Sequence, residues 1–162
     1  MLFRSDHATF IVAAGFFLGL VDGGMWGVLA LIGGSLAGAA LHLAGIDMPG
    51  GEAGVALSVI LIGALVATRS RIALPWLAGG LALAGMLHGH AYAESIFGAE
   101  PAPLGAYLIG FSLIQLGVAT AAFVLHRRLI AAREAWARRI APVLGAAVGA
   151  IGVVFLIDSF AI

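Results

Sequence analysis

The chain has 162 residues, of which 62% are hydrophobic and 10% charged, and its mean hydropathy is +1.13 at a net charge of zero. This composition excludes a soluble globular domain, and the neutral balance argues against nucleic acid or an anionic surface as a partner. The chain contains neither cysteine nor lysine, which excludes disulfides, thiolate metal ligands and lysine-based chemistry.

Six apolar stretches follow one another along the chain. Each approaches the roughly 20 residues that a helix needs to cross a bilayer core of about 30 Å. They are too long and too uniformly apolar for barrel strands, which alternate every second residue. The sequence therefore predicts an all-α integral membrane protein, a compact bundle of about six transmembrane helices in a single domain over residues 1–162. The expected spans are about 5–21, 25–46, 53–69, 72–94, 104–126 and 140–160.

The first stretch is the shortest of the six. Residues 8–21 alone would not span a bilayer, but with Asp6 and His7 included, and Arg4 reaching to the surface, the helix has roughly 20 residues. A signal peptide is the alternative interpretation. No small-x-small cleavage site stands in a polar setting, and Asp22 follows early, and both observations disfavour a signal peptide.

Arginine predicts the orientation of the bundle. Residues 127–139, RRLIAAREAWARR, are typical of a short basic amphipathic helix at the membrane interface. If the loops alternate sides, this segment, Arg69 and Arg71 lie together, and only Arg4 lies opposite. The positive-inside rule makes the arginine side cytoplasmic. We therefore expect a multi-pass protein of a bacterial inner membrane with both termini in the periplasm. The outer side then carries Asp6, His7, His42, Asp47, Glu52, His88, His90, Glu94, Glu100 and Asp158.

Two histidines and a glutamate stand at the outer end of the fourth span, in the sequence MLHGHAYAE of residues 86–94. Ionisable groups in a membrane are costly and usually face a partner, a cavity or a pathway. His90 and Glu94 are four residues apart and share a helix face, whereas His88 points about 200° away from His90. All three can meet at one ion only if the helix unwinds near Gly89. Otherwise His88 serves a different neighbour.

Imidazole and carboxylate groups without sulfur suit divalent nickel, cobalt or zinc. Asp6-His7 and Glu52 can contribute from the same side, and His42 either joins the cluster or anchors its helix at the interface. Each residue alone is more simply explained as a satisfied interfacial polar group, but their coincidence favours a metal site. Gln115 lies in the middle of the fifth span, where a hydrogen bond between helices is the ordinary role and a pathway lining is the alternative.

These residues also carry a family resemblance. Residues 87–115 and 45–67 resemble the HupE/UreJ family of nickel and cobalt permeases, and Ser5-Asp6-His7 is similar to the end of the GxDH element of that family. Tyr92 stands where many members have a second histidine. The resemblance implies uptake of nickel or cobalt. It implies as candidate metal ligands Asp6, His7, His88, His90 and Glu94, supported by Glu52.

Two functions remain open. The first is a permease for divalent nickel or cobalt with a histidine and carboxylate site at the outer side. The second is a non-transporting small membrane subunit, accessory or haem- or metal-binding, of a larger complex. A metalloprotease would need two histidines four residues apart with a glutamate beside the first, so no enzyme is expected. The expected partners are the metal cation and the lipid bilayer, with a second copy of the chain or a larger membrane complex left open. No organic cofactor and no nucleic acid are expected.

Overall fold

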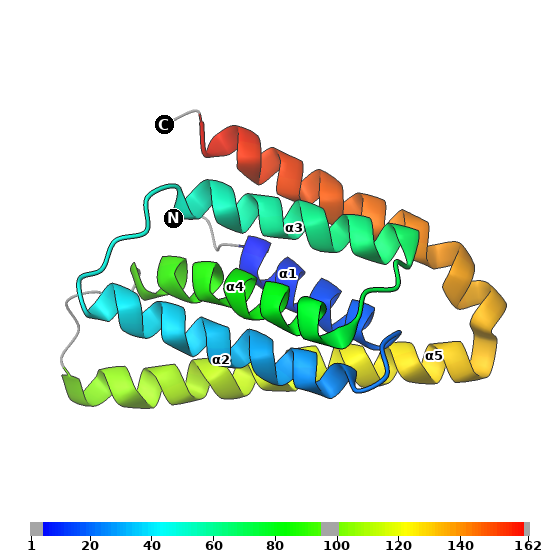
Figure 1. Ribbon diagram of the computed structural model, residues 1–162, viewed down its shortest axis with the longest axis horizontal. Coiled ribbons are helices and arrows are strands. Elements are labelled where there is room, and N and C mark those ends of the chain that lie inside the picture. Colours follow the sequence, from blue (N-terminus) through cyan, green and yellow to red (C-terminus); the bar gives the residue numbers. More distant parts are fainter. Residues whose placement is uncertain (1–4, 95–100, 161–162) are drawn as a thin grey trace.

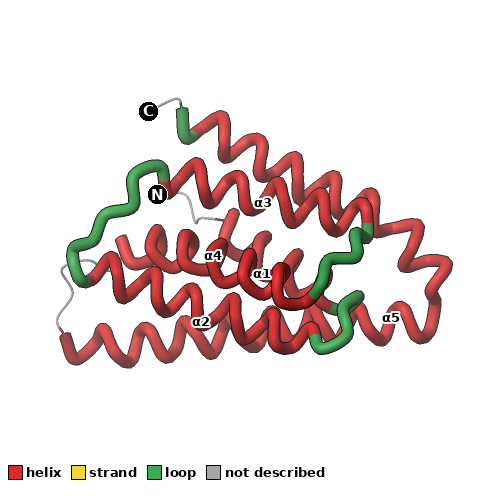
Figure 2. Tube along the Cα trace, in the orientation of Figure 1, coloured by secondary structure: helices red, strands yellow, loops and turns green. Residues whose placement is uncertain are grey.

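The computed structural model describes residues 5–94 and 101–160, and every regular element within these ranges is a helix. Short loops join the first four helices to one another (Figure 2). The predicted all-α class is confirmed for this part of the chain, whereas Arg4 and Glu100 lie outside the described residues. The helices are α1 (Ser5–Leu18), α2 (Gly24–Leu43), α3 (Gly51–Thr68), α4 (Leu74–Ala93) and α5 (Pro101–Asp158).

Local sequence explains where several of these helices begin. Gly23 and Gly50 precede α2 and α3 and have φ angles of 72° and 76°, which favour glycine because a side chain is strained there. Pro75 stands in the first turn of α4, where its missing N–H costs no helical hydrogen bond. These turn residues set the entry points of three helices that carry predicted site residues.

The predicted count of about six membrane helices is not confirmed. Three helices, namely α2, α3 and the part of α5 from Leu104 to Asp158, are long and apolar enough to cross a membrane. Helix α1 has 14 residues, and at a rise of 1.5 Å per residue it extends about 21 Å, less than the bilayer core of about 30 Å. The expected span 104–126 lies within α5, and so does the expected span 140–160 up to Asp158, where α5 ends.

Helix α5 folds back on itself at Arg133, whose backbone is not helical (φ −149°, ψ 59°). The limb before the bend contacts α1 and α2, and the limb after it runs beside α3 (Figure 1). The basic segment 127–139 forms this bend and is helical on both sides of it. Its place at a membrane interface remains a prediction.

Glycines bring α2 and α4 into backbone contact. A Cβ atom added at Gly34 or Gly38 of α2 would lie 2.0 or 1.9 Å from a carbonyl oxygen of α4. Conversely, a Cβ at Gly85 or Gly89 of α4 would lie 2.3 or 1.9 Å from a carbonyl oxygen of α2. Small residues four apart allow such close approach between helices in lipid. The α2–α4 pair is therefore held in one register, which determines how their ends meet.

The directions of the helices gather the polar groups at two opposite ends of the bundle. Helices α2 and α4 end, α1 and α3 begin, and the folded-back α5 both begins and ends toward the left in Figure 1. We call this the acidic end, because it carries the described carboxylates Asp6, Asp47, Glu52, Glu94 and Asp158 and four of the five histidines. The opposite end, which we call the arginine end, carries Arg69, Arg71, Arg127, Arg128, Arg133, Arg138 and Arg139.

Candidate metal centre

Helix α4 carries His88 and His90, its C-cap residue is Glu94, and the helix remains regular through Ala93. It does not unwind at Gly89, because this glycine is where the backbone of α4 packs against Ser35 of α2. On an unbroken helix, the side chains of His88 and His90 point in directions about 200° apart. The structure therefore divides the predicted ligands into two groups, one on each side of α4.

The first group, the outer cluster, consists of His42, His90 and Glu94. One ligand atom from each residue lies within 4.8 Å of the others. The two imidazole rings meet edge to face, with centroids 4.6 Å apart and planes at 88°. Ligand atoms that share a first-row metal at about 2.0–2.1 Å are about 3 Å apart, so small side-chain movements would close the cluster on an ion.

A backbone hydrogen bond fixes the orientation of one ring of the outer cluster. Nε2 of His90 lies 2.9 Å from the carbonyl oxygen of Ile46. Because a carbonyl only accepts hydrogen bonds, Nε2 must be the nitrogen that carries the proton. In the neutral ring, Nδ1 then holds the lone pair. This is the arrangement by which a second hydrogen bond prepares histidine to bind a metal.

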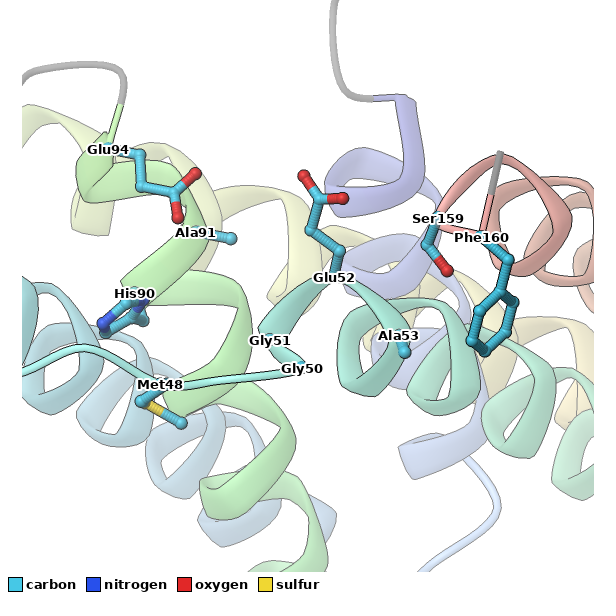
Figure 3. A pocket seen from close by; sticks show the side chains of 10 residues that line it. All are labelled: Met48, Gly50, Gly51, Glu52, Ala53, His90, Ala91, Glu94, Ser159 and Phe160. Carbon is cyan, nitrogen blue, oxygen red and sulfur yellow. The ribbon is translucent and has the colours of Figure 1, made fainter. Parts of the chain in front are cut away.

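A cavity of about 360 Å³ opens beside the outer cluster at the acidic end. His90 and Glu94 line it from α4, and Glu52 lines it from the first turn of α3. Figure 3 shows the side chains of Glu52 and Glu94 extending toward each other from the start of α3 and the end of α4. Two carboxylates at the mouth favour the entry of a cation, which agrees with the supporting role predicted for Glu52.

The second group, the inner cluster, consists of Asp6, His7 and His88, and all three side chains are buried. Nε2 of His7 lies 2.5 Å from the carbonyl oxygen of His88 and therefore donates to it. Nδ1 of His7 consequently faces Asp6, with 3.5 Å between Nδ1 and Oδ1. A nitrogen lone pair beside a carboxylate oxygen can hold a cation, either a proton or a metal ion.

Ser58 of α3 completes the surroundings of His88, and the sequence reasoning missed it. Its hydroxyl donates to the carbonyl oxygen of Val55 at 2.7 Å and lies 2.8 Å from Nε2 of His88. Because the single hydroxyl proton is used, Ser58 accepts the proton of His88. Ser58 is the one polar residue between Glu52 and Thr68 in an otherwise apolar helix. A single polar residue in an apolar helix was the sequence feature that could have identified Ser58 as a partner of the site.

Two further predicted residues belong to neither cluster. The Tyr92 hydroxyl donates to Tyr107 at 2.6 Å, and the Tyr92 ring stacks on Phe111 at 3.6 Å and lies 6.0 Å from the His7 ring. Gln115 is buried, and its amide donates to Ser35 at 3.2 Å. Gln115 thus makes the hydrogen bond between helices that a polar residue in a membrane helix usually makes.

Comparison with known proteins identifies a family. No curated protein and no solved structure matches the chain. The family described as "HupE / UreJ protein" matches residues 2–155, which is nearly the whole chain and includes both clusters. A match of this extent, together with the apolar helices, indicates a membrane protein with a role related to nickel or cobalt transport. The chain belongs to the HupE / UreJ protein family.

Proposed function

We propose that the protein is a membrane permease for divalent nickel or cobalt, and that His42, His90 and Glu94 form the site that receives the ion. The approach of their ligand atoms to within 4.8 Å carries the proposal, because these groups come from two helices and converge on one point. Imidazole with carboxylate and without sulfur is a ligand set that suits these two metals. The family of the chain supports the same cargo.

Entry of the ion would begin at the cavity. Glu52 and Glu94 attract the hydrated cation, and the imidazoles of His42 and His90 replace part of its water shell. His88 lies about 3 Å further into the bundle along α4 than His90. The inner cluster is therefore the next group that the ion would meet, with Asp6 and Nδ1 of His7 as its receiving pair.

Uptake measurements in cells that express the full chain test the proposal. We expect His90→Ala and Glu94→Gln to lower nickel and cobalt uptake, and metal affinity of the purified protein, by about tenfold or more. The matched control is Asp158→Asn, which neutralises an exposed carboxylate of the acidic end outside both clusters. This control should import metal like the parent.

Two results would overturn the proposal. The first would reject the proposed site, and the second would reject the transport function. If His90→Ala and Glu94→Gln import metal like the parent, the outer cluster is not the receiving site. If the purified protein binds nickel at this cluster but cells expressing it import none, the chain is a metal-binding subunit and not a permease.

A further inference from the structure

A second, larger cavity lies at the arginine end of the bundle. Its volume is about 920 Å³, and it lies between the α1–α2 turn, the loop after α3 and the bend of α5. Four arginines line it, and the carboxylates among its described lining residues are Asp22 and Glu134. The arginines are Arg69, Arg71, Arg127 and Arg138.

The carboxylates do not balance these four positive charges. Arg127 lies 3.9 Å from Asp22, whose side chain is fully exposed, and Arg138 lies 3.6 Å from Glu134 on the open surface of α5. Exposed pairs of this kind are weak because water screens them. Within the described part of the chain, neither Arg69 nor Arg71 has a carboxylate at salt-bridge distance. The cavity therefore favours an anion.

Tryptophan indicates the level of this cavity in a membrane. Trp26 and Trp76 stand in the first turns of α2 and α4, and Trp136 lies just past the bend of α5, so all three tryptophans of the chain are at the arginine end. Their side chains are 68%, 81% and 48% exposed. Exposed tryptophans concentrate at the level of the lipid headgroups. An anion in the cavity would therefore lie where lipid phosphates lie.

We propose that this cavity binds the headgroup phosphate of an acidic phospholipid, with Arg69 and Arg71 as its main contacts. Arginine suits this role because its planar guanidinium donates two parallel hydrogen bonds to a phosphate. Basic pockets between membrane helices bind acidic headgroups by the same means. The net charge of zero had argued against an anionic surface, but the charges are segregated, and this end is strongly basic. The site is independent of the proposed metal transport.

Lipid titration of the purified full-length protein in neutral detergent tests the proposal, with the thermal unfolding midpoint as the readout. Phosphatidylglycerol should raise the midpoint saturably, whereas phosphatidylcholine and inorganic phosphate at matched ionic strength should not. The double variant R69Q/R71Q should bind phosphatidylglycerol about 100-fold more weakly, since the loss of each charge-assisted hydrogen-bond partner of the phosphate costs about tenfold.

The matched control is R128Q/R139Q, which removes two exposed arginines of the same end that do not line the cavity. It should retain the parent affinity within about threefold, because exposed arginines that do not contact the phosphate act only through charge that water and salt screen. Equal losses in the two double variants would overturn the proposal, because they would indicate diffuse surface charge. Equal stabilisation by phosphatidylcholine, or by inorganic phosphate, would also overturn it. If R69Q/R71Q does not fold, Arg71→Gln replaces it, and an undiminished affinity of that variant contradicts the proposal.

Discussion

At the scale of single residues, His88 and His90 are separated by one glycine, yet their rings serve different neighbours. Nε2 of His88 donates to the Ser58 hydroxyl, and Nε2 of His90 donates to the carbonyl oxygen of Ile46. In each neutral ring the remaining nitrogen, Nδ1, can bind a metal. Each hydrogen bond thus orients one histidine, His88 in the inner cluster and His90 in the outer cluster, and leaves the lone pair on its Nδ1.

Replacing Ser58 with alanine should weaken the inner cluster. Ser58→Ala removes the acceptor of a buried imidazole proton while leaving the volume of the site nearly unchanged. We expect the free energy of unfolding to fall by about 1–3 kcal/mol, the usual cost of removing one partner of a buried hydrogen bond. Denaturant titration of the protein in detergent measures this change.

The control for this variant is Ser112→Ala, because Ser112 is half-buried and its hydroxyl donates to the carbonyl oxygen of Leu108 within its own helix. Its effect should stay within about 0.5 kcal/mol. Equal effects of the two substitutions would mean that the contact between Ser58 and His88 contributes nothing of its own.

The sequence predicts part of this arrangement. Spacing along one helix separates His88 from His90, and the structure agrees because α4 remains regular. Spacing does not reveal that His42 faces His90, because that depends on the register between α2 and α4. Nor does it reveal that the carbonyl oxygen of Ile46 is the acceptor, since every residue has a backbone carbonyl and the residue type does not show which one binds.

At the scale of elements, the outer cluster depends on the α2–α4 pair, since His42 comes from one helix and His90 and Glu94 from the other. Gly38→Ala should separate this pair, because the new Cβ would lie 1.9 Å from the carbonyl oxygen of Met86. Overpacking of this kind costs about 1–3 kcal/mol. We expect thermal unfolding at a lower temperature and weaker nickel binding in a titration of the purified protein.

A second glycine of α2 provides the control. Gly33 is exposed, and a Cβ there would meet no atom within 4 Å. Gly33→Ala should leave stability unchanged or raise it by up to about 1 kcal/mol, because alanine favours the helix more than glycine does. If Gly38→Ala behaves like Gly33→Ala, the glycine contacts do not set the distance between the two helices.

Element boundaries were predicted more closely than the number of membrane helices. The expected span 53–69 overlaps the helix Gly51–Thr68, and 72–94 overlaps the helix Leu74–Ala93, because glycine marks the start of the first helix and proline the start of the second. Hydropathy cannot anticipate that α1 ends at Leu18, or that one helix contains two apolar stretches joined by a bend at Arg133. Those features depend on packing between segments distant in the sequence.

At the scale of the whole molecule, the segregation of charge predicts the direction in which the bundle crosses the membrane. The arginine end should face the cytoplasm, because positively charged loops are retained there, and the acidic end should face outward, where the metal would arrive.

The chain has no cysteine, so single introduced cysteines can report on each end without background labelling. Pro49→Cys lies in the loop between α2 and α3 at the acidic end, and Ala132→Cys lies at the bend of α5, and both positions are exposed. In intact spheroplasts, a membrane-impermeant thiol reagent should label Pro49→Cys, whereas Ala132→Cys should react only after permeabilisation. The reverse pattern would place the outer cluster on the cytoplasmic side, where it could release an ion but not capture one from outside.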